Sequence, residues 1–400
     1  MKNYDFETII PRYGKGSGKW DEMRQVNPSV EDGIIPFSVA DMELKNAPEI
    51  TEGLGRFLAE NILGYAGATP DYYSAVCSWM KRRHNWDIRP EWIVENKGVV
   101  EGFFTSINAF TGGDEGVILM TPVYYPMTWG IVRNRRRMIE NKLIYRSGRY
   151  EIDFEDLEAK ARDPNTRMLL LCSPHNPVGR VWKAEELTRI GRICIDNNVL
   201  VVSDEIHFDL VMPGYRHTVF ASLSEEFAGH SVIHTAPSKT FNLAGLQTSN
   251  TIIPNPDLRE LYRREMMRHL TPRCNILGYE ACRLAYEYGE DWLEQALALI
   301  DTNRKLVKDF LSREIPLIRV VDMEGTYLLW LDFNPLGIEY RELECIMRME
   351  ARLFFDEGHI FGEAGRGFER WNLACPTRSV QEGLDRLKSA LNKSGTGGSV

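Results

Sequence analysis

The sequence lacks any long hydrophobic run. No apolar stretch in its 400 residues approaches the ~18–20 residues that a membrane-spanning helix needs. The first residues, MKNYDFETII, show neither a basic start followed by an apolar core nor a small-residue cleavage site. We therefore expect a soluble, cytoplasmic protein and exclude a role within a membrane.

Paired cysteines and an excess of basic charge are also missing. The seven cysteines are scattered and never form a Cys-x-x-Cys pair, which is typical of free thiols in a reducing compartment, and we expect no metal site. The net charge of −9 argues against binding to nucleic acid. The one basic run, RNRRR at residues 133–137, is predicted to be a solvated helix face.

Short apolar runs rich in branched side chains are what the sequence does contain. With 43% hydrophobic and 10% aromatic residues, the chain can bury a large core. The runs are GVILM (116–120), MLLLC (168–172), VLVVSD (199–204), SVIHT (231–235) and SNTII (249–253). Such runs predict strands that are buried on both faces of a mostly parallel sheet.

Helical spacing fills the intervals between these runs. Residues 184–198 place Leu187, Ile190 and Cys194 on one apolar stripe, and strand alternating with helix predicts a layered α/β domain. After about residue 285 the pattern changes to one long helix followed by two strands of another unit. The predicted parts are an N-terminal segment (1–49) that joins the small domain, a large domain (50–285), a small α+β domain (286–392) and a flexible tail (393–400).

Polar residues follow four of the predicted strands at their carboxyl ends, where ligands collect in open α/β sheets. They are Tyr124, Asn176, Asp204 with His207, and Lys239. Singly, each has an ordinary explanation as a turn residue, a helix cap, a core side chain or a solvated loop lysine. Together, a lysine for a Schiff base, an aspartate for a pyridinium nitrogen and an aromatic ring for stacking are what pyridoxal phosphate requires.

The sequence also resembles a known family. It is similar to pyridoxal-phosphate enzymes of the aspartate aminotransferase fold (fold type I), and more narrowly to the cystathionine β-lyase branch called the MalY/PatB family. The matching stretches include FSVADMELKNAPEI, LGYAGATPDYY, TPVYYPM, LLCSPHNPVGRVW, VVSDEIHFDL, APSKTFNLAGLQTS and WNLACPTRSVQEGLDRL. The resemblance covers nearly the whole chain and implies a mostly parallel sheet of seven strands flanked by helices, plus a smaller α+β domain.

The resemblance implies a role for each residue at the strand ends. Lys239 matches the Schiff-base lysine, which also moves the Cα proton. Asp204 matches the acid that keeps the ring nitrogen protonated. Asn176 matches the donor to the phenolic oxygen, with His207 near the same edge. Tyr124 matches the aromatic residue that stacks on the ring.

The cofactor phosphate needs hydrogen-bond donors. The stretch GVVEGFF can offer the backbone N–H groups of Val99 and Val100 at a helix start, and the side chain of Glu101 is then expected to point away. Ser238, just before the lysine, is a candidate hydroxyl donor. Gln247 stands where aspartate aminotransferases carry a phosphate-binding arginine, which agrees with the lyase branch.

Two further assignments rest on the resemblance. Tyr65 matches a tyrosine that reaches the phosphate of the neighbouring subunit, so a homodimer is expected. Arg378, together with Asn176, is expected to bind the substrate α-carboxylate. However, Thr377 intervenes where the family has proline followed directly by arginine, so in an extended segment Arg378 reaches the site only if the backbone bulges.

The implied reaction is β-elimination from an amino acid such as cystathionine or another cysteine S-conjugate, which gives pyruvate, ammonia and a thiol. A class I/II aminotransferase uses the same residues and is the first alternative; Gln247 and the SDEIH stretch favour the lyase. A cofactor-binding regulatory protein with little turnover is the second alternative, and the presence of both Lys239 and Asp204 argues against it.

Overall fold

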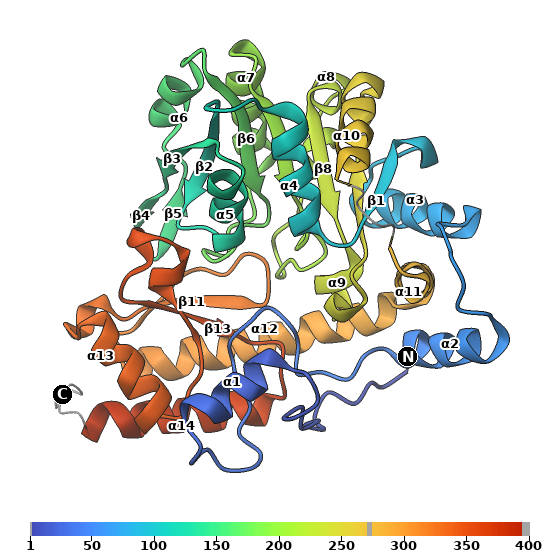
Figure 1. The fold of residues 1–400 in the computed structure, drawn as a ribbon. Coiled ribbons are helices and arrows are strands. Elements are labelled where there is room, and N and C mark those ends of the chain that lie inside the picture. Colours follow the sequence, from blue (N-terminus) through green and yellow to red (C-terminus); the bar gives the residue numbers. More distant parts are fainter. Residues whose placement is uncertain (1, 270–273, 394–400) are drawn as a thin grey trace.

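The computed structural model describes residues 2–269 and 274–393, and its larger sheet has seven strands in the order β1-β9-β8-β7-β6-β2-β3 (Figure 1). The strands are β1 (Ile93–Asn96), β2 (Gly116–Thr121), β3 (Arg137–Lys142), β6 (Thr166–Cys172), β7 (Leu200–Asp204), β8 (Ser231–Thr235) and β9 (Ser249–Ile252). The five from β3 to β8 run parallel, whereas β9 and β1 pair antiparallel. The predicted α/β class with a mostly parallel sheet is confirmed.

Helices cover both faces of this sheet (Figure 1). On one face lie α4 (Val99–Phe110), α5 (Tyr125–Arg133) and α10 (Pro256–Arg268), and on the other lie α6 (Phe154–Ala161) and α7 (Ala184–Asp196). Successive strand residues point to opposite faces, so Val117 and Leu119 join the core under α4, while Ile118 and Met120 join the core on the other side. Burial on both faces explains why these strands read as continuous apolar runs.

A second, antiparallel sheet has the order β10-β11-β13-β12. Its strands are β10 (Arg319–Val320), β11 (Leu328–Asp332), β12 (Asp356–Glu357) and β13 (Phe368–Asn372). The helices of this part are α12 (Glu290–Glu314), α13 (Tyr340–Cys345) and α14 (Thr377–Lys393). The long helix and the two strands expected after residue 285 are therefore present, whereas the exact domain boundaries stay predictions.

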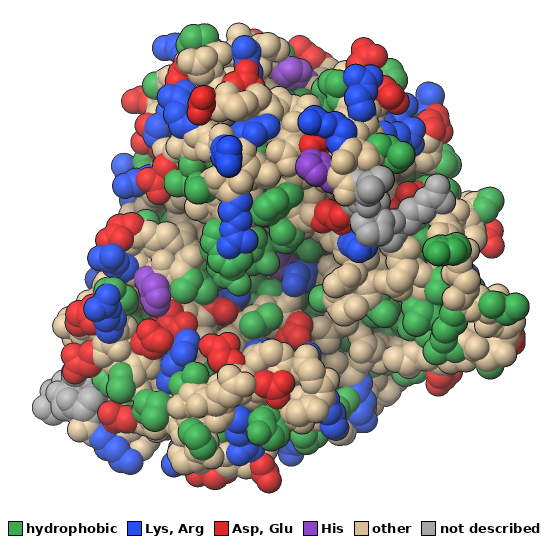
Figure 2. Space-filling model, in the orientation of Figure 1, with side chains coloured by type: hydrophobic (Ala, Val, Ile, Leu, Met, Phe, Trp, Pro, Cys, Tyr) green, Lys and Arg blue, Asp and Glu red, His purple; other side chains and the backbone are tan. Residues whose placement is uncertain are grey.

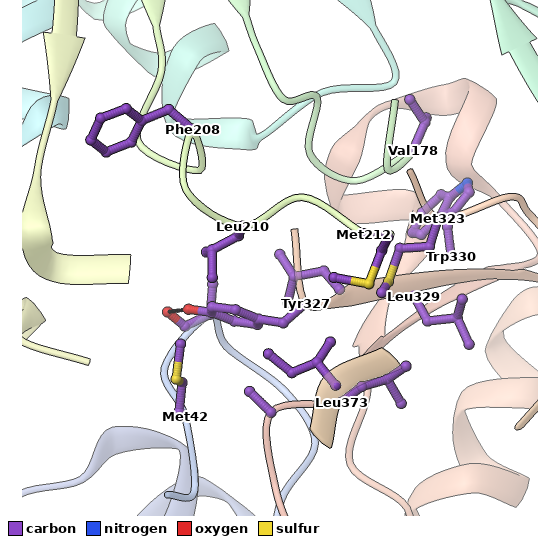
Figure 3. Close-up of a cluster of buried hydrophobic side chains, with 14 of the residues drawn as sticks. Met42, Val178, Phe208, Leu210, Met212, Met323, Tyr327, Leu329, Trp330 and Leu373 are labelled. Carbon is purple, nitrogen blue, oxygen red and sulfur yellow. Dashed lines mark hydrogen bonds between the residues drawn. The ribbon is translucent and has the colours of Figure 1, made fainter. Parts of the chain in front are cut away.

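The remaining elements complete the chain. They are α1 (Gly18–Val26), α2 (Pro48–Glu60), α3 (Pro70–His84), β4 (Ile144–Arg146), β5 (Arg149–Glu151), α8 (Glu225–Gly229), α9 (Pro237–Thr240) and α11 (Ile276–Tyr288). Apolar side chains fill the junction between the two sheets, where Met42, Met212, Tyr327, Leu329 and Leu373 lie in one buried cluster (Figure 3). The N-terminal segment that carries Met42 is thereby built into the same core.

One local prediction is wrong. The basic run 133–137 is not a helix face, because α5 ends at Arg133 and β3 begins at Arg137, with Arg135 in the left-handed region (φ 57°) between them. A residue in this conformation cannot continue a right-handed helix. Most of the run is exposed, as the solvated part of the prediction requires.

Three further expectations concern the chain as a whole. All seven cysteines lie in the described part and are free thiols, as predicted. Among the described residues, no helix is both long enough and apolar enough to cross a bilayer. Of the predicted tail, residue 393 ends α14, and residues 394–400 lie outside the described residues.

Candidate active site

The polar residues at the strand ends meet at one edge of the larger sheet. Asp204 ends β7, Lys239 lies in α9 directly after β8, Asn176 follows β6, and Tyr124 precedes α5 after β2. With His207 they line a single cavity. Figure 2 shows the face of the molecule hollowed between its upper and lower parts, with hydrophobic side chains along the upper rim.

Lys239 places its ammonium group inside this cavity. The Nζ atom donates a hydrogen bond to the backbone oxygen of Ala40 at 2.7 Å. Burial lowers the pKa of Lys239 to about 8, against the opposing effect of the carboxylates of Asp41 and Asp204. A lysine with this pKa is partly neutral near pH 8, as a nucleophile or a proton acceptor must be.

Asp204 is buried near Lys239, whose charge it faces. Burial raises the pKa of Asp204 to about 7, and its Oδ1 accepts one backbone hydrogen bond, from Ile206 at 3.1 Å. A carboxyl group with so few partners gains most from a cationic N–H donor, because the ion pair offsets the cost of burying its charge. A pyridinium nitrogen is such a donor.

His207 and Tyr124 complete the walls. The His207 ring is buried, its Nδ1 has no hydrogen-bond partner, and burial holds its pKa well below the ordinary value, so the imidazole is neutral. The backbone N–H of Tyr124 donates to the Asn176 carbonyl at 3.0 Å, which joins the ends of β2 and β6. Burial raises the pKa of Tyr124, so its phenol keeps its proton.

The start of α4 forms one end of the cavity. Val99 and Val100 both line it, and the first N–H groups of a helix have no partner within the helix, which suits an anion such as phosphate. Glu101 turns back, as expected, since its carboxylate accepts the backbone N–H of Lys97 at 2.9 Å. Ser238 and Gln247 also line the cavity.

Arg370 is a candidate site residue that the sequence reasoning missed. It lies in β13 of the second sheet, is buried, and donates from Nη1 to Asn176 Oδ1 at 2.8 Å. Its Nε donates to Asp356 Oδ2 at 3.1 Å. A guanidinium beside Asn176 is suited to bind a carboxylate. The available signal was an arginine among aromatic residues in the stretch FERWN.

Arg378 lies elsewhere, which corrects the expectation from the sequence. The segment is not an extended strand with a bulge, because α14 begins at Thr377. Arg378 therefore stands exposed in the first turn of this helix, and it is not among the residues that line the cavity. The structure brings Arg370, not Arg378, to Asn176.

Tyr65 also lies outside the cavity of its own chain. It is fully exposed, in the loop between α2 and α3, together with Ile62 and Leu63. This placement is the one required of a residue that serves a neighbouring subunit, and the subunit contact itself stays a prediction.

The remaining residues fit pyridoxal phosphate. Asp204 is the acid that the pyridine nitrogen of the cofactor requires, and Lys239 is the amine that its aldehyde requires. The start of α4 offers the hydrogen-bond donors that its phosphate requires. Two buried polar groups can be satisfied by a polar ligand. They are the Nδ1 atom of His207, which has no hydrogen-bond partner, and the carboxyl group of Asp204, which accepts one backbone hydrogen bond.

Comparison with known proteins identifies the class. Residues 35–387 match the family model for aminotransferase class I and II, and the chain belongs to this family. It is 40% identical to cystathionine β-lyase PatB of Bacillus subtilis over 97% of this chain and 100% of that protein. It is 28% identical to protein MalY of Escherichia coli over 97% of this chain and 99% of that protein. The resemblance predicted from the sequence motifs is confirmed.

Solved structures agree with this family. Cystalysin from Treponema denticola, whose structure contains pyridoxal 5'-phosphate, superposes with a TM-score of 0.97 at 47% identity, over 98% of this chain and 100% of that chain. The pyridoxal-phosphate-bound C–S lyase from Staphylococcus hominis superposes with a TM-score of 0.89 at 30% identity, over 98% of both chains.

Proposed function

We propose that this protein is a pyridoxal-phosphate-dependent carbon–sulfur β-lyase that converts cystathionine or another cysteine S-conjugate to pyruvate, ammonia and a thiol. The observation that carries the proposal is that Lys239, Asp204 and Asn176 line one cavity, and that Arg370 donates a hydrogen bond to Asn176 there. The full-length similarity to PatB and to C–S lyases supports this reaction type within the family.

The chain's own residues supply binding and proton transfer. Pyridoxal phosphate, when bound, supplies the electron sink that makes the substrate Cα proton acidic. Arg370 and Asn176 hold the α-carboxylate, and Lys239 accepts the Cα proton. The Cβ–S bond then breaks, and the sulfur leaves as a thiol with that proton. Water hydrolyses the remaining three-carbon fragment to pyruvate and ammonia, so atoms and electrons balance without an oxidant.

The direct test is pyruvate release from L-cystathionine by the purified protein with added pyridoxal phosphate. We expect pyruvate without any added keto acid, in an amount equal to the thiol released. The Lys239→Ala variant is the control and should release none. Equal rates in the two proteins, or no pyruvate from any thioether of cysteine, would reject the lyase.

An aminotransferase is the second candidate, because the matching family model bears that name and the same residues serve both reactions. Transamination needs a keto acid as second substrate and releases no thiol. Glutamate formed from 2-oxoglutarate, with the cysteine S-conjugate consumed and no thiol released, would therefore favour it. A bound-cofactor spectrum that no amino acid changes would instead indicate the regulatory protein.

We also propose that the protein acts as a homodimer in the cytoplasm. The support for the dimer is the exposure of apolar side chains around Tyr65, since Ile62 and Leu63 are 91% and 61% exposed. A second copy would cover this surface and bring Tyr65 to the phosphate end of its neighbour's site. The free thiols of all seven cysteines support the location.

A further inference from the structure

We propose that the backbone carbonyl of Ala40 is a fixed acceptor that holds the Lys239 amine whenever this amine is free, and that Tyr327 is the positioning residue of that carbonyl. The inference rests on the part of the proposed function that makes Lys239 the reacting amine. It assigns to the N-terminal segment around Ala40 a task in the active site.

Two donors converge on the Ala40 oxygen. Lys239 Nζ lies at 2.7 Å and the Tyr327 hydroxyl at 2.8 Å. A carbonyl oxygen has two lone pairs, so it accepts both hydrogen bonds at once. Tyr327 is completely buried directly before β11, and its ring makes a T-shaped contact with the His207 ring, with 5.9 Å between the ring centroids. It lies in the apolar junction beside Met42, so its hydroxyl has little freedom to move (Figure 3).

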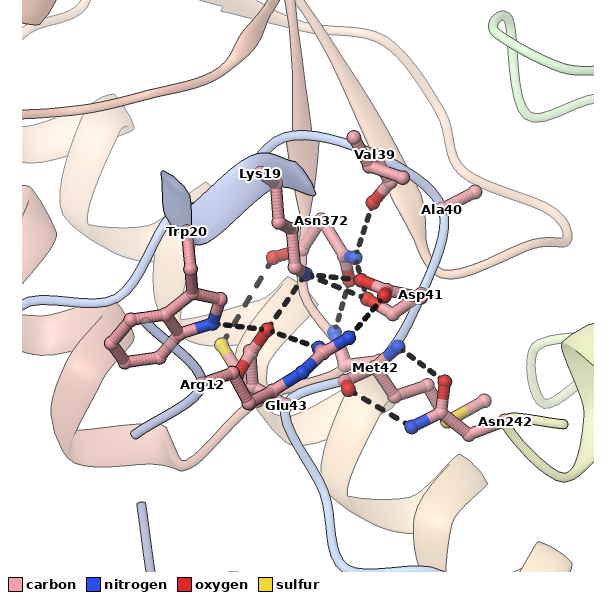
Figure 4. A network of polar contacts seen from close by, with 12 residues as sticks. Arg12, Lys19, Trp20, Val39, Ala40, Asp41, Met42, Glu43, Asn242 and Asn372 are labelled. Atoms are coloured by element: carbon pink, nitrogen blue, oxygen red, sulfur yellow. Dashed lines mark hydrogen bonds and ion pairs between the residues drawn. The ribbon is translucent and has the colours of Figure 1, made fainter. Parts of the chain in front are cut away.

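The neighbours of Ala40 are held on both sides. Val39 has φ 58°, a left-handed conformation that is strained for a β-branched residue. Asp356 Oδ2 accepts the Val39 N–H at 2.9 Å. Asn372 Nδ2 donates to the carbonyls of Val39 at 2.8 Å and Asp41 at 2.7 Å (Figure 4). These contacts fix the direction of the Ala40 carbonyl between them.

A buried charge cluster anchors the segment after Ala40. The Lys19 side chain is 1% exposed, and its Nζ lies 2.5 Å from Asp41 Oδ1 and 2.9 Å from Glu43 Oε1. Arg12 pairs with the same two carboxylates at 2.7 Å and 2.9 Å (Figure 4). With two cations on two carboxylates, the cluster is neutral overall, and removing any member would leave it with an uncompensated net charge.

The Ala40 carbonyl and burial have opposite effects on the pKa of Lys239. A hydrogen bond from the ammonium to a carbonyl stabilises the charged form of Lys239, whereas burial destabilises it. The other charges that face Lys239 are Asp41 and Asp204, which favour its charged form, and Arg370 and Lys19, which oppose it; His207 beside it is neutral. Loosening the Ala40 carbonyl should therefore lower the pKa of Lys239.

The test is the titration of Lys239 in the full-length protein after pyridoxal phosphate has been removed. Brief acetylation at a series of pH values, read by peptide mass spectrometry, gives a curve for this lysine. In Tyr327→Phe we expect the midpoint to fall by roughly 0.5 to 1 pH unit, the equivalent of one hydrogen bond. Asn372→Ser should shift it in the same direction without touching the Ala40 oxygen.

The control is Tyr150→Phe, which removes a buried hydroxyl that accepts a hydrogen bond from Trp330 Nε1 and does not contact Ala40. It should leave the Lys239 midpoint unchanged, and continued protection of the buried Lys19 reports that each variant is folded. An unchanged or raised midpoint in Tyr327→Phe would overturn the proposal, because a rise means that Tyr327 only competes for the carbonyl.

A second readout uses the holoenzyme. In Tyr327→Phe we expect kcat to fall with KM for the amino acid unchanged, because Arg370 and Asn176 are not touched. Equal changes in both, or none, would speak against a positioning role. The titration needs no turnover, so its result stands even if the lyase reaction is rejected.

Discussion

Two arginines near the C-terminal end of the chain have opposite expected roles. Arg370 is buried beside Asn176, whereas Arg378 is exposed in the first turn of α14. We expect Arg370→Ala to raise KM for the amino acid by roughly 10- to 100-fold, the loss of a charge-assisted contact. Arg378→Ala is the matched control and should leave KM within about twofold. Steady-state kinetics with L-cystathionine measures both KM values. A large rise in KM for Arg378→Ala, with little change for Arg370→Ala, would instead assign carboxylate binding to Arg378.

Asp204 makes the stability of the cofactor-free protein depend on pH. Its pKa is about 7 in the folded protein and ~3.9 in the unfolded chain. Between these values the folded state binds the extra proton, so this contribution to stability declines as the pH rises from about 4 to about 7.

Asp204→Asn removes this titration. We expect the Tm of the cofactor-free variant to exceed that of the cofactor-free wild type at pH 8, and the difference to vanish near pH 4, by differential scanning calorimetry. A difference that is constant with pH would show that Asp204 titrates normally. In the holoenzyme the same change should reduce kcat far more than cofactor affinity.

The site residues fall into two groups by how visible they are in a sequence. Asp204 and Lys239 each end a buried apolar run, so the rule for parallel strands finds them. Arg370 lies in the middle of β13, paired with Trp330 of β11, in a different sheet. Only the packing of the two sheets brings it to Asn176, and no local pattern reports that packing.

The position of the α4 N-terminus, where the cofactor phosphate is predicted to bind, depends on how closely this helix packs against the sheet. A Cβ atom at Gly102 would meet His234 Nδ1 at 2.7 Å. Gly102→Ala should therefore push α4 outward, lower stability by about 1–3 kcal/mol and weaken cofactor binding. Gly55 in α2 is the control, because its Cβ would meet nothing within 4 Å and alanine there favours the helix. Cofactor titration followed by absorbance compares them; equal affinities would contradict the prediction.

Among the elements, the central strands were predictable and the edges were not. Strands β2, β6, β7 and β8 each contain consecutive apolar residues because both of their faces are buried. The edge strand β3, residues RMIENK, is half exposed and reads as polar. The basic run 133–137, which leads into β3, was wrongly predicted to be a helix face, because charge alone does not distinguish a helix face from a turn.

For the assembled molecule, the predicted dimer can be tested by complementation. Lys239→Ala and Tyr65→Ala should each be nearly inactive as pure proteins. If Tyr65 serves the neighbouring site, mixed dimers contain one intact site, and random exchange of equal amounts restores about a quarter of wild-type activity. The control is a mixture of Lys239→Ala with Asp204→Asn, which should stay inactive. If the first mixture stays inactive although mass spectrometry confirms that subunits have exchanged, Tyr65 does not serve the neighbouring subunit's site.

The span of the site along the chain bears on its synthesis. Ala40 holds Lys239 from 199 residues away, and Arg370 reaches Asn176 across 194 residues. A growing polypeptide therefore contains Lys239 long before it contains Arg370, the arginine proposed to bind the carboxylate. The residues predicted to bind the cofactor and the arginine predicted to bind the substrate thus leave the ribosome at different times, and only a chain extended through β13 can join them in one site.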